Sequence, residues 1–228
     1  MSRIAIVAAL PGELKPLVKG WQFERRGTVH LWRNTSGEKE IVAACAGAGL
    51  ARATRAFAAA ESFGQIDSVV SIGWAGALRA DFEPGRAYRC CGVIDQKAGE
   101  RFAAEGGQQN CWLITSPRVA DEGEKRRLTL SYKAALVDME AAAIARLAVM
   151  RQIPFICIKG VSDGFNDRLP DFNRFLSLDG QMQLGKLVVY ALLHPACWPS
   201  LVRMGENSKR ASLAMADAVR AMLANLGS

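Results

Sequence analysis

The sequence predicts a layered α/β domain with a largely parallel or mixed central sheet, and two observations support this prediction. Short apolar runs bounded by turn residues recur along the chain, and Ala-rich segments of helical length lie between several of them. Such alternation of strands and helices is typical of a layered α/β fold. In addition, the chain has 228 residues and is 50% hydrophobic, which is enough to bury a full-size core in one domain.

The predicted elements follow one another at regular intervals. The two clearest helices are Leu50–Phe63 and Met139–Met150. Residues Glu24 to Glu40 indicate an antiparallel hairpin with its turn at Asn34–Gly37. Neither a linker nor an internal repeat marks a domain boundary, so we expect a single domain over residues 1–228. The expected strands are Ile4–Leu10, Val29–Arg33, Glu40–Ala46, Ser68–Ile72, Tyr88–Ile94, Cys111–Thr115 and Ile153–Lys159.

The last third of the chain, from about residue 172 to 228, is predicted to be helical and packed on the sheet. Phe172–Leu193 has apolar positions at helical spacing and ends at His194-Pro195. A final helix is expected from about Ser208, a suitable N-cap, with an apolar stripe of Leu213, Val219, Met222, Leu223 and Leu226. The alternative is an exposed apolar patch for an apolar ligand or a membrane surface, formed by Trp198, Leu201, Val202 and Met204.

The charge pattern argues against a nucleic-acid-binding protein. The net charge is +7, but the basic residues are scattered, and the densest group, Lys125-Arg126-Arg127, is expected to form a solvated face. Because no aromatic residues are interleaved with them, we do not expect nucleic-acid binding. Attraction to an anionic surface or substrate stays open.

The cysteines and the N-terminal segment further limit the class of protein to which the chain can belong. The six cysteines show no C-x-x-C spacing, and His30 and His194 are the only histidines, so we expect no metal site and no Cys–His nucleophile. The thiols are predicted to be buried and reduced, as in a cytoplasmic protein. Ile4–Leu10 breaks at Pro11-Gly12 without a cleavage site, which predicts a strand rather than a signal peptide. No window reaches the ~18 uncharged apolar residues of a membrane-spanning helix.

Two acidic residues, Glu140 and Asp163, are the strongest indication of a functional site. Glu140 lies where a predicted strand turns into a helix, and Asp163 lies where the next strand ends. Both can therefore reach one rim of the sheet, where open α/β sheets bind their ligands. The alternative is structural, with Glu140 at the positive end of a helix and Asp163 as a strand-end cap.

Three further turns follow predicted strands. Glu13, after the first strand, either belongs to the same site or simply begins a helix. The Gly-rich turn Ala46–Arg52 can bind a phosphate or a carboxylate through backbone N–H groups, but it lacks the third glycine of a dinucleotide fingerprint. The small residues of Gly73–Leu78 permit either close approach to a flat ligand or tight packing.

The order of these segments along the chain carries a family resemblance. They are Arg3–Ala9 followed by Glu13, Gly47-Ala48-Gly49, Ser71–Leu78 with Pro84-Gly85 downstream, Val137–Glu140, and Ser162-Asp163. In this order they resemble the purine nucleoside phosphorylase and nucleosidase superfamily, nearest to its methylthioadenosine/adenosylhomocysteine nucleosidases. The resemblance implies a three-layer α/β/α sandwich with a twisted mixed central sheet, a small-molecule nucleoside substrate, no cofactor, and a homo-oligomer.

The resemblance also implies roles for single residues. Asp163 and Glu13 are the implied catalytic residues: Asp163 would protonate or hydrogen-bond purine N7, and Glu13 would activate the attacking water. Burial is expected to keep Asp163 protonated at neutral pH. Glu140 and Met139 would bind the ribose. The implied base-binding residues are Ala75, Gly76, Val119 and Ser162.

The chain departs from the family pattern at three places. Trp74 stands where the family usually has a small or hydroxyl residue, so we expect an altered pocket floor, or an altered phosphate or water site. Asp138 replaces a common Glu, and Ser116–Val119 lacks the Phe that many members stack on the base. Glu13 favours water as the nucleophile. Phosphate stays open because of Lys15, Arg52 and Arg79.

The C-terminal run from His194 to Gly205 resembles the hopanoid-associated phosphorylase/nucleosidase branch, which removes adenine from adenosylhopane in hopanoid biosynthesis. Hydrolysis of adenosylhopane is therefore the leading prediction. It places a cytoplasmic enzyme at the membrane periphery through its C-terminal segment. Three alternatives stay open: a methylthioadenosine/adenosylhomocysteine nucleosidase, a phosphate-dependent purine nucleoside phosphorylase, and a non-catalytic purine-nucleoside binding protein.

Overall fold

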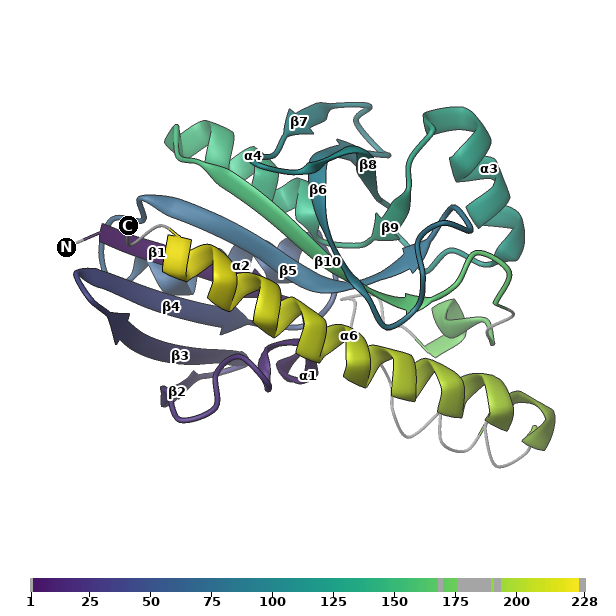
Figure 1. Cartoon of the computed structure of the whole chain (residues 1–228), viewed down its shortest axis with the longest axis horizontal. Coiled ribbons are helices and arrows are strands. Elements are labelled where there is room, and N and C mark those ends of the chain that lie inside the picture. Colours follow the sequence, from purple (N-terminus) through teal and green to yellow (C-terminus); the bar gives the residue numbers. More distant parts are fainter. Residues whose placement is uncertain (1, 168–169, 176–189, 191–193, 226–228) are drawn as a thin grey trace.

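The computed structural model describes residues 2–167, 170–175, 190 and 194–225, and its centre is one sheet of ten strands (Figure 1). The strands are β1 Ser2–Ala8, β2 Gln22–Arg26, β3 Val29–Ser36, β4 Lys39–Cys45, β5 Ser68–Ala77, β6 Ala87–Asp95, β7 Arg101–Ala103, β8 Gln108–Thr115, β9 Leu136–Asp138 and β10 Phe155–Asp163. The helices are α1 Pro11–Leu14, α2 Leu50–Glu61, α3 Glu122–Tyr132, α4 Ala141–Arg151 and α6 Trp198–Asn225, with the 3₁₀ turns η1 Phe172–Phe175 and η2 Pro195–Cys197.

The sheet is mixed, as the sequence predicts. Its order is β10-β6-β8-β9-β5-β1-β4-β3-β2, with β7 paired to β6. β1 runs parallel to β4 and β5, whereas β2 and β3 add an antiparallel edge. β10 pairs in parallel with β5 and antiparallel with β6, so β5, β10, β6, β8 and β9 close into a ring. Every residue of β10 is buried, which places this strand at the centre of the molecule.

Helices cover both faces of the sheet and complete the three predicted layers. On one face, α2 and α4 pack their alanines and Phe57 against the sheet in one core. On the other face, α1 and α6 contribute Leu14, Met215 and Val219 to a second core with Ile6. Figure 1 shows α6 running diagonally across this face, with its N-terminal half extending beyond the sheet. α3 closes the end of the ring, where Leu128 joins a third core.

The C-terminal helix differs from its prediction. α6 begins at Trp198, and Ser208 is a buried residue inside the helix rather than its N-cap. Pro199 lies in the first turn, where proline removes no helical hydrogen bond, so it does not separate the helix from the preceding residues. Leu213 is 49% exposed, and the buried stripe is Ala211, Met215, Ala216, Val219 and Met222. Leu226 and most of the predicted helix Phe172–Leu193 lie outside the described residues; the described start of that helix is η1.

Several shorter elements are also new relative to the sequence analysis. The predicted hairpin is a three-stranded meander, and its second turn lies at Gly37 because β3 continues to Ser36. β7 and α3 were not predicted as elements, and β9 was expected only as the strand end before Glu140. Hydrophobic periodicity does not predict α3, because only Lys125 and Leu128 are buried along this helix.

The structure also bears on membrane-spanning helices and on the cysteines. No helix in the described part of the chain is long and apolar enough to cross a membrane. All six cysteines are free thiols, and four of them are buried, namely Cys45, Cys90, Cys111 and Cys157.

Candidate active site

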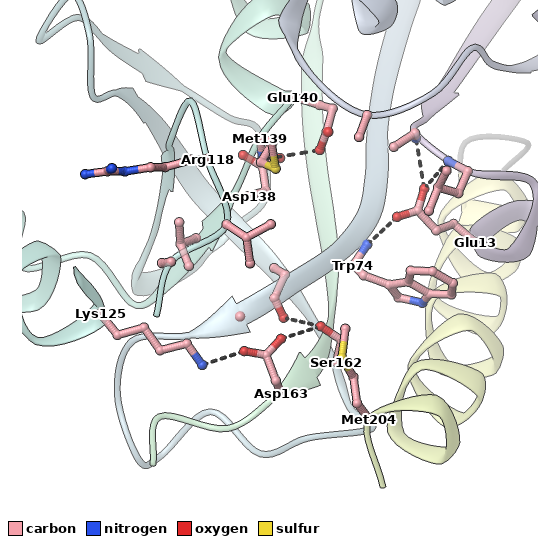
Figure 2. Close-up of a pocket in the computed structure, with 18 residues that line it drawn as sticks. Glu13, Trp74, Arg118, Lys125, Asp138, Met139, Glu140, Ser162, Asp163 and Met204 are labelled. Carbon is pink, nitrogen blue, oxygen red and sulfur yellow. Dashed lines mark hydrogen bonds and ion pairs between the residues drawn. The ribbon is translucent and has the colours of Figure 1, made fainter. Parts of the chain in front are cut away.

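A cavity of about 170 Å³ lies where β1, β5, β8, β9 and β10 present their carboxyl ends (Figure 2). This is the position at which α/β sheets place ligand sites. Figure 2 shows Glu13, Glu140 and Asp163 on three sides of it. The cavity brings together all eight site residues predicted from the sequence, Glu13, Ala75, Gly76, Val119, Met139, Glu140, Ser162 and Asp163.

Glu13 is buried and joins the ends of two strands. Its carboxylate accepts hydrogen bonds from the backbone N–H groups of Ala9 and Leu10, both at 2.8 Å, and from that of Trp74, also at 2.8 Å. Burial raises the pKa of Glu13 above its ordinary value, although these N–H donors and the charge of Lys159 oppose the rise. Gly73 keeps the space open, because a Cβ there would lie 3.1 Å from the Glu13 Oε1.

Glu140 occupies the N-cap position of α4, but its side chain accepts no hydrogen bond from the first turn of that helix. Asp138 and Thr115 do so instead: Asp138 Oδ2 accepts the Ala141 N–H at 2.9 Å, and the Thr115 hydroxyl accepts the Ala142 N–H at 3.0 Å. The Glu140 carboxyl group instead accepts a hydrogen bond at 2.7 Å from the N–H of Gly49, which belongs to the Gly-rich turn after β4. Gly49 has φ 96°, a conformation that favours glycine. Glu140 thus stands at the start of α4, as the structural alternative expects, but its carboxyl group binds Gly49 and lines the cavity.

Burial, and next the charge of Asp138, raises the pKa of Glu140 to about 8. Asp138 itself belongs to a buried network of an ion pair and a hydrogen bond. The Lys159 Nζ lies 2.9 Å from Asp138 Oδ2, and the Thr115 hydroxyl donates to Asp138 Oδ1 at 2.7 Å. Burial lowers the pKa of Lys159, but Asp138 and other nearby charges outweigh it and raise that pKa. Glu140 is consequently neutral near pH 7 and can act as a hydrogen-bond donor.

Asp163 is the last residue of β10, and both of its carboxylate oxygens have partners. The Ser162 hydroxyl donates to Oδ1 at 2.6 Å, and the Lys125 Nζ lies 2.5 Å from Oδ2. Asp163 is buried, as expected, and in addition forms an ion pair with Lys125. Gly76 permits the close approach, because a Cβ there would lie 3.0 Å from Asp163 Oδ2.

Lys125 lines the cavity, although the sequence did not indicate it as a candidate site residue. It was expected in a solvated basic face with Arg126 and Arg127, but it is 1% exposed, whereas these two arginines are on the surface. The sequence did contain a usable signal. Asp121 accepts the Glu124 N–H at 2.8 Å, and an Asp followed three residues later by Glu marks a helix start. A helix in that register places Lys125 and Leu128 on one face.

Val119 lies in the cavity wall, but its backbone polar groups already have a partner. The Asn173 side chain of η1 accepts the Val119 N–H at 2.9 Å and donates to the Val119 carbonyl at 2.9 Å. Met139 is half-buried in the wall beside Glu140. Ser162 also donates to the carbonyl of Ala75 at 3.3 Å.

A second, larger space adjoins the cavity. It is a groove of about 1300 Å³, and it shares Leu10, Trp74 and Met204 with the cavity. Trp74, where we expected an altered pocket, lines both spaces, and its indole N–H donates to the Ser208 carbonyl and the Ser212 hydroxyl of α6. The other residues of the groove are Pro11, Gly12, Lys15, Pro16, Val18, Lys19, Trp32, Phe172, Leu201, Gly205, Ser208, Lys209, Ser212 and Leu213.

The three basic residues that left phosphate open do not line the cavity. Lys15 lines the groove, and Arg79 pairs with Asp81 at 2.6 Å. Arg52 is buried and donates to the Ala46 carbonyl at 3.0 Å. The cations that do line the cavity are Arg118 and Lys125. Among the residues with described positions, no group of three or more His, Cys, Asp or Glu side chains could hold a metal ion.

The sequence profile of the phosphorylase superfamily matches residues 3–122 and 111–192, which together span most of the chain. The chain belongs to the phosphorylase superfamily. Membership confirms the predicted superfamily, and with it the prediction that the protein is a nucleosidase or nucleoside phosphorylase enzyme. No curated protein matches the chain in sequence.

Solved structures of this superfamily share the fold at low sequence identity. The methylthioadenosine/adenosylhomocysteine nucleosidase of Helicobacter pylori, with butyl-thio-DADMe-Immucillin-A, has 16% identity and a TM-score of 0.73, over 99% of each chain. The Arabidopsis thaliana 5′-methylthioadenosine nucleosidase has 16% identity and a TM-score of 0.74, over 98% of this chain and 95% of that one. The Helicobacter pylori futalosine hydrolase has 15% identity and a TM-score of 0.73, over 98% of each chain.

Proposed function

We propose that the protein hydrolyses the N-glycosidic bond of a 5′-modified adenine nucleoside and releases adenine, with adenosylhopane as its leading substrate. The observation that carries this proposal is the placement of Glu13, Glu140 and Asp163 around one cavity that opens beside a large groove. Superfamily membership and the nucleosidases of the same fold support the reaction class.

The three acids have complementary tasks in this reaction. Breaking C1′–N9 leaves negative charge on the purine and positive charge on the sugar. Asp163 and its hydrogen-bond partner Ser162 serve the N7 side of the base, while Ala75 and Gly76 let the base approach the backbone. Glu140, neutral near pH 7, binds a ribose hydroxyl, and Met139 packs against the sugar. Glu13 accepts a proton from the attacking water, a step that typically contributes ~10²–10⁴-fold.

Water rather than phosphate is the proposed nucleophile. Glu13, Asp138 and Asp163 line the cavity, so a phosphate dianion would lie near three acidic side chains. Lys15, Arg52 and Arg79 lie elsewhere, as described above. A general base placed at Glu13 suits water, which must lose a proton as it attacks.

The groove supports a large apolar 5′ group. Its walls include Trp32, Phe172, Leu201 and Leu213, and it meets the cavity at Trp74. A methylthio group would leave most of the ~1300 Å³ unfilled, whereas a polycyclic hydrocarbon would fill it and bury apolar surface on both sides. Methylthioadenosine and adenosylhomocysteine are the alternative substrates.

We also propose a cytoplasmic protein that meets the membrane surface through the start of α6. Trp198 and Val202 are 49% and 60% exposed there, next to the groove that would receive a lipid substrate. A homo-oligomer is proposed from the family alone, and light scattering coupled to size-exclusion chromatography tests it.

The deciding experiment measures adenine release from adenosylhopane and from methylthioadenosine, each with and without phosphate. We expect release without phosphate and a higher kcat/KM for adenosylhopane. Strict phosphate dependence would establish phosphorolysis, and efficient turnover of methylthioadenosine alone would remove the lipid substrate. Asp163→Asn is expected to lower release by ~10²–10⁴-fold. If the wild type releases no adenine but it and Asp163→Asn bind adenine nucleosides equally well, the protein is a binding protein instead.

A further inference from the structure

Lys125 is a buried cation whose position the proposed roles do not yet explain. It projects from α3 into the cavity wall, with a side chain that is 2% exposed. Its Nζ lies 2.5 Å from Asp163 Oδ2 and donates to the Gly164 carbonyl at 2.7 Å (Figure 2). A buried ion pair gains little net stability, because two charges lose their hydration when they are buried. The pair is better explained by the reaction than by folding.

We propose that Lys125 is a positioning residue that supplies, through Asp163, the proton taken up by the leaving base. The proposal rests on the proposed function. Both oxygens of Asp163 accept hydrogen bonds, one from Ser162 and one from Lys125, and only the lysine ammonium carries a readily transferable proton. Lys125 is thus the source of the transferred proton, and Asp163 is the group that contacts the base.

The proposed step conserves protons and electrons. As C1′–N9 breaks, its electron pair moves into the purine, one proton passes from Lys125 Nζ to Asp163, and one passes from Asp163 to N7. The water oxygen bonds to C1′, and the water proton moves to Glu13. Lys125 is left as a neutral amine and Glu13 as a neutral acid. Exchange with solvent then returns a proton to Lys125 and removes one from Glu13.

Other charged groups near the pair belong to separate contacts. Asp167 accepts the Gly164 N–H at 2.7 Å and pairs with Arg203 at 3.2 Å. Arg118 lines the same cavity, and Asp138 and Glu140 lie across it. On α3 itself, Glu124 pairs with Arg127 at the surface. Substitution of Lys125 therefore acts chiefly on Asp163.

The test compares Lys125→Met, which keeps a similar length without the charge, with Lys125→Arg, which keeps the charge. Rates are measured from pH 5.5 to 9 on the adenine nucleoside that the wild type cleaves best. They are also measured on the 4-nitrophenyl glycoside of 5-methylthioribose, whose phenolate leaves without a proton at nitrogen. Circular dichroism checks folding, and Lys125→Gln replaces Lys125→Met if the latter does not fold.

We expect Lys125→Met to lose ~10²-fold or more of kcat at pH 8.5 and far less at pH 5.5, where protons from solvent can replace the one that Lys125 supplies. The ratio of adenine release to phenolate release should fall by a similar factor, and Lys125→Arg should keep the alkaline rate. An equal loss at every pH and on both substrates would reduce Lys125 to a structural role and overturn the proposal. Absence of adenine release by the wild type would instead overturn the proposed function, and this proposal with it.

Discussion

Glu140 makes the stability of the protein depend on pH in a defined direction. Its pKa is raised from 4.5 to about 8, first by burial and then by Asp138. Between these two values the folded chain holds a proton on Glu140 that the unfolded chain has lost. The free energy of unfolding therefore falls as pH rises from about 4.5 to about 8 and levels off above that range.

Glu140→Gln should remove this slope, because the amide does not ionise. From pH 5.5 to pH 8.5, we expect the free energy of unfolding of the variant to rise by about 1–2 kcal/mol relative to that of the wild type. A carboxyl group sealed from water would give a larger change, but Glu140 faces the cavity. Urea unfolding at both pH values measures it. Glu83→Gln, at an exposed ion pair with Arg86, is the control and should leave the slope unchanged. Identical slopes in the wild type and Glu140→Gln would contradict the assignment.

The side chain of Asn173 binds the backbone of Val119, the residue that we expected to bind the base. A carboxamide has one donor and one acceptor group, as does the amino-bearing edge of adenine, so the two compete for Val119. Asn173→Ala should lower KM for adenine nucleosides by ~5–150-fold, since two neutral hydrogen bonds of about 0.5–1.5 kcal/mol each no longer need to be displaced.

The matched control for this variant is Asp171→Ala, in the same turn. Asp171 accepts the Asn173 N–H at 3.1 Å and pairs with Arg174, but it has no bond to Val119. Steady-state kinetics of both variants decide the outcome. A rise in KM for Asn173→Ala alone would mean that Asn173 builds the base site rather than occupying it.

At the level of elements, α6 lines both the cavity and the groove, which share Met204. Leu213 lines the groove from α6 with half of its side chain exposed, so a carboxylate there would repel an apolar 5′ group without disturbing the core. Loss of the leucine contact is worth about 1.5–3 kcal/mol. Leu213→Asp should therefore lower kcat/KM for adenosylhopane by ~10–100-fold and change that for methylthioadenosine less than threefold.

Leu130→Asp provides the control, because Leu130 is 83% exposed on α3 and lies in neither space. Competition kinetics with the two substrates in one tube report the ratio directly. Equal losses on both substrates in Leu213→Asp would show that the groove does not receive the 5′ group.

For the whole molecule, the sequence predicted what depends on local pattern. The strands that flank the site, the mixed sheet and the meeting of Glu13, Glu140 and Asp163 follow from apolar runs, turn residues and motif order. The partners of those acids could not be predicted. Lys125 reaches Asp163 from 38 positions away, through a helix without an apolar stripe, and Asn173 reaches Val119 from 54 positions away. Such pairings depend on how α3 and η1 pack, which no local pattern encodes.

The net charge and the exposed start of α6 together predict binding to anionic membranes. Trp198 and Val202 offer apolar surface, and Lys15, Lys19 and Lys209 line the adjacent groove of a chain with a net charge of +7. We expect co-sedimentation with phosphatidylglycerol vesicles, weaker binding to phosphatidylcholine vesicles, and release as salt shortens the screening length.

Trp198→Ser should weaken this binding several-fold, because the indole would otherwise enter the interface. Met150→Ser is the matched control: Met150 is 65% exposed, but it lies at the end of α4, which covers the opposite face of the sheet. Equal loss in the two variants would indicate non-specific adsorption. Binding that persists in Trp198→Ser and disappears with salt would leave net charge alone as the cause, and the start of α6 would then have no part in reaching a lipid substrate.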